Sequence, residues 1–279
     1  MLKRTISIII ICVMLSGCTF KLVYNSLDFW IDYYLSDYLD LDSQQQNELE
    51  QGLEIALAQH RQQQLAVFHK LISALQTDLK KPLTAAQIAN YHRRFTQAGE
   101  ASALVFVSPI IDVVKTMSTS QVTASLQTIE KEMAERREER LSKSPQQRLQ
   151  DRYDELKDKT QDWIGGLTKQ QKQLILSLAQ LQLQQSTMFQ NIATNNLSQL
   201  KTILKQRKNV QFASSIEQQV KNILSLKNAV FQTQLDEYLI QRFVIMKQLN
   251  ESLSPRQLRY LQRELTSLRK DIATLIQKK

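Results

Sequence analysis

The pentapeptide Leu167-Thr168-Lys169-Gln170-Gln171 contains the pattern that decides the fold of this chain. A threonine, serine or aspartate in its second position can cap the free amides of a helix's first turn. A glutamine three residues later can reach back to the amide of the capping residue. The pattern recurs at Leu41-Asp42-x-x-Gln45, Leu83-Thr84-x-x-Gln87, Met117-Ser118-x-x-Gln121 and Leu253-Ser254-x-x-Gln257. The repeats therefore predict five helix starts.

Turn-forming residues are scarce in the chain. Its 279 residues include five glycines and four prolines, and 42% of the residues are hydrophobic. Strands that turn after about eight to twelve residues would need many more turn formers. We therefore expect an all-α fold, an elongated bundle of long antiparallel helices.

Apolar spacing predicts the helices before the glycine pair at 165–166. Ser108-Pro109 resembles a cap followed by proline in the first helical position, so a break is expected there. Between residues 130 and 162 nine bases and ten acids alternate at short spacing, which predicts a charged helical pair that projects from the core. The expected helices are 25–39, 43–79, 84–107, 109–117, 119–141 and 145–164.

Gly165-Gly166 is the clearest break in the chain, and three long helices are expected after it. The predicted organisation is an anchor with an aromatic and acidic helix over 18–42, an N-terminal helical region over 43–164 and a C-terminal three-helix region over 165–279. These parts are expected to form one continuous domain over 24–279. Their apolar seams are Leu174, Leu178, Leu181, Met188 and Ile192; Ile216, Val220, Ile223, Val230, Leu235 and Tyr238; and Leu258, Leu261, Leu265, Leu268, Ile272 and Leu275.

The amino terminus has the pattern of a secretion signal. Lys3 and Arg4 precede an apolar run over 6–15, which is too short for a bilayer that takes about 20 residues. The tetrapeptide Leu15-Ser16-Gly17-Cys18 resembles the lipobox of bacterial lipoproteins. That resemblance implies cleavage of residues 1–17 after Gly17, a diacylglycerol thioether on Cys18 and an acyl chain on the new amino terminus. An ordinary signal peptide that contains a cysteine by chance is the alternative.

The residue after the cysteine bears on location. Thr19 stands where an aspartate would retain a lipoprotein in the inner membrane, so the sorting rule of enteric bacteria implies the periplasmic face of the outer membrane. The inner membrane is the alternative. Cys12 would leave with the signal, so we expect no disulfide, and no cofactor apart from the covalent lipid.

Charge is distributed unevenly. Residues 22–60 contain eight acids and neither lysine nor arginine, whereas residues 61–279 contain 33 bases and 19 acids. Outside the cytoplasm such a basic body suits lipid headgroups, lipopolysaccharide or acidic unfolded chains, and nucleic acid is not an expected partner. Six aromatic residues between Tyr24 and Tyr38 suit either the membrane interface or the base of the core.

No catalytic or metal-binding motif stands out. The three histidines form no HExxH pattern, and there is no cysteine pair, Ser-His-Asp ordering or glycine-rich phosphate loop, so neither an enzyme nor a metal site is expected. His60-Arg61 and His92-Arg93-Arg94 could bind an anionic group together if their helices pack side by side. The alternative is that they are ordinary polar positions on helix flanks.

Two family resemblances follow from these residues. The repeated pentapeptide resembles the LTxxQ motif of the small helical periplasmic proteins Spy and CpxP, and residues 83–87 and 167–171 match it in full. Most of the chain resembles an uncharacterised family of helical lipoproteins of Gram-negative bacteria. This resemblance implies location and a helical fold but no mechanism, and it lies in the lipobox, Leu22-Val23-Tyr24-Asn25, Leu41-Asp42, His60-Arg61 and Trp163-Ile164-Gly165 before Leu167-Thr168.

Together these features predict a membrane-anchored lipoprotein with a binding or scaffolding role and no catalysis. The expected partner is an envelope protein or an unfolded client, as for a chaperone. One alternative is a binder of anionic lipid or lipopolysaccharide. Another is a cell-wall hydrolase, which would need a cleft with a carboxylate of raised pKa that the sequence does not nominate.

Overall fold

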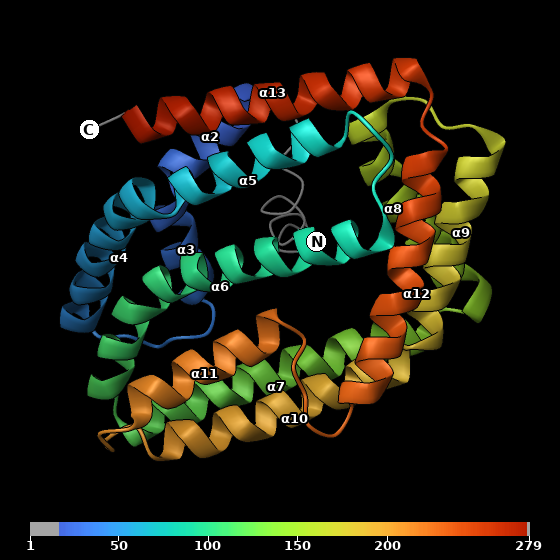
Figure 1. Ribbon diagram of the computed structural model, residues 1–279. Helices are drawn as coiled ribbons and strands as arrows, with labels where there is room; N and C mark the ends of the chain where they lie inside the picture. Colours follow the sequence, from blue (N-terminus) through green and yellow to red (C-terminus); the bar gives the residue numbers. More distant parts are fainter. Residues whose placement is uncertain (1–16, 278–279) are drawn as a thin grey trace.

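A computed structural model describes residues 17–277 of the chain (Figure 1). These residues contain no strand, so the prediction of an all-α fold is confirmed. The expected signal segment, residues 1–16, and the side chain of Cys18 lie outside the described part. The helices are α2 (Gly17–Asn25), α3 (Leu27–Leu35), α4 (Ser43–Gln63), α5 (Leu65–Asp78), α6 (Ala85–Thr116), α7 (Thr119–Ser142), α8 (Pro145–Ile164), α9 (Lys169–Gln184), α10 (Ser186–Lys205), α11 (Phe212–Leu224), α12 (Gln232–Glu251) and α13 (Pro255–Gln277).

All five repeated motifs cap a helix as predicted, at the starts of α4, α6, α7, α9 and α13. At α9 the Thr168 amide donates to Gln171 Oε1 at 3.0 Å, and the Gln171 amide donates to Thr168 Oγ1 at 3.2 Å. A further capping box at Ser144 and Gln147 begins α8. Lys143 precedes it in place of an apolar residue, so the sequence pattern did not include it.

Four of the motif glutamines also join their helices in pairs. The side-chain amides of Gln171 and Gln257 donate to each other's Oε1 atoms at 3.0 and 2.8 Å. Each amide also donates to the loop before its partner's helix, to the carbonyls of Ser252 and Gly166 at 3.1 and 2.8 Å. Gln121 Nε2 donates to Gln45 Oε1 at 2.7 Å in one direction only, since Gln45 Nε2 donates to Thr116 Oγ1 at 3.2 Å. The motif therefore fixes helix ends to each other as well as capping them.

Several expected helices are divided. The helix expected over 43–79 breaks at Gln64, and that expected over 25–39 is replaced by α2 and α3, which meet at Ser26. The first two helices expected after Gly165 each become two, divided at Gln185 and across residues 225–231. Gln64 and Gln185 have φ near −90°, which any residue adopts. The breaks therefore need no glycine or proline that could have revealed them.

The break expected at Ser108-Pro109 is wrong, because α6 continues through Pro109 to Thr116. A proline inside a helix removes one hydrogen bond and commonly bends the axis, and α6 bends towards its C-terminal end in Figure 1. Gly52 of α4 lies directly against it, since a Cβ atom at Gly52 would be 2.5 Å from Pro109 Cβ. The two residues together set the crossing of α4 and α6.

The helices form a broad frame (Figure 1). α5 and α13 pack along one edge, α6 crosses the middle, α10 and α11 lie at the opposite edge, and α4 and α12 run across these directions. α13 packs against α2, α5 and α8, so both ends of the described chain share one core. The arrangement is thus broader than the elongated bundle expected from the sequence, because short connections turn the chain sharply.

The two charged helices take different places. α8 packs against α9 and α13, and Trp163 near its end lies against the main core. α7 has few buried residues, Val122 and Ser125, and its charged half contacts the fold through Glu130 with Lys201 and Glu132 with Tyr38. The charged helices therefore do not project as a pair.

The main core lies between α4, α5, α6 and α13 and includes Leu49, Leu53, Ile72, Leu265 and Leu275. A second cluster forms where the end of α6 meets α7 and α11. Within the described part α6 is the single helix long and apolar enough to cross a membrane, a test that a core helix of a soluble protein also passes. α6 packs against α4, α5, α11 and α12.

Candidate functional site

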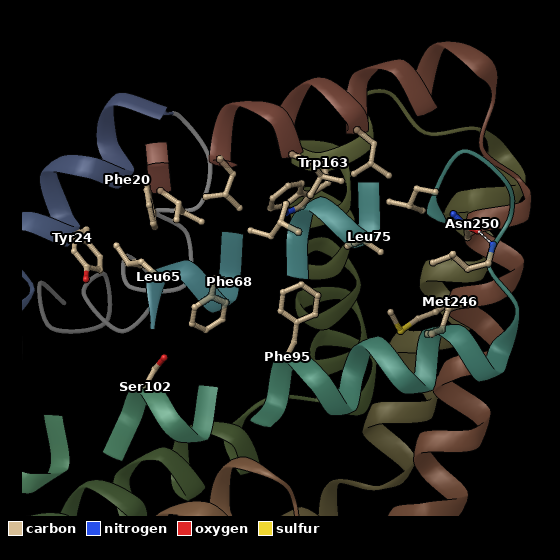
Figure 2. Close-up of a pocket in the computed structure, with 18 of the residues that line it drawn as sticks. Phe20, Tyr24, Leu65, Phe68, Leu75, Phe95, Ser102, Trp163, Met246 and Asn250 are labelled. Carbon is tan, nitrogen blue, oxygen red and sulfur yellow. Dashed lines mark hydrogen bonds between the residues drawn. The ribbon is translucent and has the colours of Figure 1, made fainter. Parts of the chain in front are cut away.

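A cavity of about 650 Å³ lies between α5 and α13 on one side and α6 on the other (Figure 2). Its volume is within the range of about 300–1,000 Å³ that small-molecule sites occupy. The walls are made almost entirely of aliphatic and aromatic side chains. The apolar residues that line it are Phe20, Leu27, Leu65, Phe68, Ile72, Leu75, Leu79, Leu83, Ile88, Phe95, Trp163, Met246, Leu261, Leu265, Leu268 and Ile272.

The cavity is long in the direction of the surrounding helices. Figure 2 shows Phe20 and Tyr24 near one end, Phe68 and Phe95 in the middle, and Asn250 at the other end. The apolar stripe of α5 consists of Leu65, Phe68, Ile72 and Leu75. It faces the cavity because α5 and α6 splay apart after the turn at Gln64, and that turn left no signal in the sequence.

A tyrosine and a histidine form the polar end of the cavity. Tyr24 Oη and His60 Nδ1 are 2.8 Å apart, and both residues are buried. Burial lowers the pKa of His60 to about 4, and burial raises the pKa of Tyr24 although Arg61 nearby opposes the shift. Both groups are therefore neutral near pH 7, so this end offers hydrogen bonding without charge.

Ser102 contributes an unused hydroxyl. Its Oγ atom is buried, none of residues 17–277 forms a hydrogen bond with it, and the side chain points into the cavity in Figure 2. At the far end Asn250 Oδ1 accepts a hydrogen bond from the Leu83 amide at 2.7 Å. A ligand here would be held mainly by exclusion of apolar surface from water, with Ser102 available for one polar group.

The two basic clusters predicted to bind one anion do not meet. The His60 ring contacts Phe106 of α6 at 5.2 Å between centroids. Phe106 follows His92 by fourteen residues on this helix, which is about 21 Å along the axis. The shared anion site expected from His60-Arg61 and His92-Arg93-Arg94 is therefore not formed.

Each of these basic residues has a local role instead. Arg61 lies over the Tyr24 ring, 5.8 Å from its centroid, and Arg94 lies over Tyr91 at 5.6 Å. Arg93 Nη2 donates to Asn90 Oδ1 at 2.7 Å. His92 packs against Phe243, and burial, with the charge of Arg242, lowers the pKa of His92.

α2 connects the cavity to the predicted lipidation position. The helix begins at Gly17 and Cys18, and its residues Phe20 and Tyr24 line the cavity. Lys21 Nζ lies 3.2 Å from Asp271 Oδ1, which fixes α2 to α13. Among residues 17–277 no group of three or more His, Cys, Asp or Glu side chains is placed to hold a metal ion.

The described part of the chain is thus an all-α frame around an apolar cavity. Residues 37–238 match the profile of a family described as a family of unknown function, DUF6279, and the chain belongs to this family. No curated protein and no solved structure matched the chain.

Proposed function

We propose that this chain is a lipid-anchored binding protein without catalysis, and that its cavity holds a long apolar ligand such as the acyl chain of a lipid. The observation that carries the proposal is a long cavity of about 650 Å³ whose walls are almost wholly apolar. The lipobox-like Leu15-Ser16-Gly17-Cys18 supports lipidation of Cys18, and Thr19 after it supports a place on the periplasmic face of the outer membrane.

The size of the hydrophobic effect makes an acyl chain a suitable ligand. Burial of one methylene group contributes about 0.8 kcal/mol, so ten methylenes contribute roughly 8 kcal/mol before the entropy losses of association. The neutral Tyr24 and His60 and the free hydroxyl of Ser102 suit a carbonyl or hydroxyl group better than a charged one. The ligand's charged part, if any, would therefore lie outside the cavity.

The test is titration with a fluorescent long-chain fatty acid. Ser102→Leu fills part of the cavity and removes a buried hydroxyl that has no hydrogen-bond partner among residues 17–277, so the protein should fold normally and bind the probe at least tenfold more weakly. Ser198→Leu places the same change on the exposed face of α10 and should bind like the wild type. Equal affinity of wild type and Ser102→Leu, with both folded, would reject the proposal.

A second candidate, binding of an envelope protein or an unfolded client, is favoured by exposed apolar side chains around α11 and α12. Val210 is 96% exposed, Val230 72% and Ile240 63%. A protein that holds unfolded chains should suppress aggregation of a denatured enzyme at stoichiometric amounts. Val230→Ser with Ile240→Ser should weaken that suppression, whereas Ser102→Leu should not.

A further inference from the structure

Several arginines gather where the end of α7 meets α10 and α12, away from the apolar cavity. Arg140 lines two adjoining hollows of the surface. One hollow, of about 550 Å³, also includes Arg152 and Arg242, and the other, of about 420 Å³, also includes Arg136 and Arg137. Arg140 is therefore central to the group.

Hydrogen-bond donors of this group are buried and unused. Arg140 Nε and Nη2 and the Nε atoms of Arg148 and Arg242 are out of contact with solvent, and residues 17–277 provide no acceptor for them. Nε and Nη2 lie on one edge of the guanidinium plane. That edge donates two parallel hydrogen bonds to two oxygens of one carboxylate or phosphate group.

Two other arginines in the group, Arg136 and Arg152, already have partners. Arg136 Nη2 lies 2.6 Å from Glu132 Oε1, and Arg152 contacts Glu155 and Gln182. Arg140 instead has basic neighbours. Burial lowers the pKa of the Arg140 guanidinium, and the positive charges of Arg137 and Arg148 lower it further. An anion bound between these side chains would relieve that repulsion.

The surrounding side chains suit a polar ligand. Gln182, Ser186 and Gln190 line the larger hollow beside Arg140. Its apolar side includes Phe189 and Tyr238, whose rings pack edge to face with centroids 5.3 Å apart. The hollow therefore has polar side chains that can form hydrogen bonds and one wall made of two packed aromatic rings.

We propose that Arg140 and Arg242, which line the larger hollow, form a binding site for a phosphoryl group, with the positive charge of Arg148 beside Arg140. A phosphoryl group presents more terminal oxygens than a carboxylate and so better matches the three unused donor nitrogens of Arg140 and Arg242. The group could belong to free phosphate or to a lipid headgroup. This site does not depend on the proposed acyl-chain cavity, because different residues build the two.

Calorimetric titration of the full chain tests the site with two ligands, inorganic phosphate and a short-chain water-soluble phosphatidic acid. At least one should bind, with affinity that falls as salt is added. Arg140→Gln should weaken binding at least tenfold, while Arg259→Gln, the same change at an exposed position of α13, should not. Tighter binding of phosphatidic acid would assign the site to a headgroup, and equal or tighter binding of phosphate to free phosphate.

Thermal unfolding separates loss of binding from loss of fold. Arg140→Gln removes an unpaired, partly buried charge, so its melting temperature should equal or exceed that of the wild type. Added ligand should raise the melting temperature of the wild type and leave that of the variant unchanged. Failure of both ligands to bind the wild type, or equal binding by Arg140→Gln, would overturn the proposal.

Discussion

Gln171 and Gln257 are buried polar side chains whose hydrogen-bonding capacity is filled. In each, Oε1 accepts from the capping residue's amide and from the partner glutamine, while Nε2 donates to the partner and to a loop carbonyl. A side-chain amide has two donor hydrogens and two acceptor positions, so the pair is saturated. Removal of either member leaves several buried groups without partners.

We therefore expect Gln171→Leu to lower the free energy of unfolding by about 3 kcal/mol, since each buried polar group left unpaired costs about 1–3 kcal/mol. The exposed capping box offers a matched control. Gln147→Leu should cost about 1 kcal/mol or less, because Gln147 Oε1 serves its own cap on the surface. Chemical denaturation measures both values, and similar losses at the two positions would contradict the role given to the pair.

His60 should make stability depend on pH. Its pKa is about 4 in the folded chain and 6.5 in the unfolded chain. Between pH 4 and pH 6.5 the unfolded chain binds a proton at His60 and the folded chain does not. The contribution of His60 to the free energy of unfolding is therefore fully present above pH 6.5 and is lost as the pH falls towards 4. The loss approaches about 3 kcal/mol.

His60→Gln retains a hydrogen-bonding side chain opposite the Tyr24 hydroxyl and removes the titration. Unfolding free energies measured from pH 7 to 4 should therefore fall less steeply in the variant than in the wild type. Parallel curves for the two proteins would show that His60 does not carry this dependence.

At this scale the sequence predicted what is local. The cap and its glutamine are three residues apart, so their hydrogen bonds follow from the pattern Thr168-x-x-Gln171. The pairing of Gln171 with Gln257 joins positions 86 residues apart and depends on how α9 and α13 are placed. The spacing of residues along the chain does not predict this pairing. It also does not predict that Ser102 of α6 faces the cavity.

The crossing of α4 and α6 shows how two residues position whole elements. We expect Gly52→Ala to destabilise the fold by about 1–3 kcal/mol, because its Cβ would lie 2.5 Å from Pro109 Cβ and the proline ring cannot move aside cheaply. Gly99→Ala on α6 is the matched control. Its Cβ would meet nothing within 4 Å, so the same change should stabilise by about 1 kcal/mol through helix propensity.

Thermal or chemical unfolding of the two variants should give opposite signs. Stabilisation by Gly52→Ala would mean that α4 and α6 do not approach each other closely at Gly52 and Pro109.

Element boundaries were predicted well where a chemical signal marks them. α7, α8, α9 and α13 begin at a cap or proline visible in the sequence, and α8 ends before Gly165, whose φ of 75° favours glycine. The breaks at Ser26, Gln64 and Gln185 were missed because the apolar stripe continues across them. The break predicted at Pro109 was wrong, since a proline can remain inside a helix when a neighbour such as Gly52 leaves room for it.

At the scale of the whole molecule, Lys21 and Asp271 join the first and last described helices. Asp271 is 7% exposed, and Lys21 Nζ is 3.2 Å from its Oδ1 atom. We expect Lys21→Met to lower the free energy of unfolding by about 1–3 kcal/mol, because it leaves a buried carboxylate without its cation. Acyl-chain binding should weaken as well, since α2 supplies Phe20 and Tyr24 to the cavity.

A second change supplies the control. Lys21→Met leaves the Asp271 carboxylate without a cation, and Asp271→Asn removes that negative charge. The double variant Lys21→Met with Asp271→Asn should therefore regain part of the stability that Lys21→Met loses. Additive losses in denaturation experiments would show that the two side chains do not interact.

The all-α fold could be predicted from the shortage of glycine and proline, but the frame and its cavity could not. Both depend on the separation of α5 and α13 from α6. That separation is set by turns that no sequence pattern marks. The charge pattern indicated a basic body, yet it did not indicate that Arg140 of α7 and Arg242 of α12 line one hollow.

The most direct test of the central claim is lipid analysis of the protein isolated from the cells that produce it. Solvent extraction followed by mass spectrometry should recover about one non-covalent acyl-chain lipid per wild-type molecule and much less from Ser102→Leu. Any lipid on Cys18 stays covalently bound and is counted separately on the intact protein. Recovery of no non-covalent acyl chain from the wild type, or equal amounts from both proteins, would contradict the account.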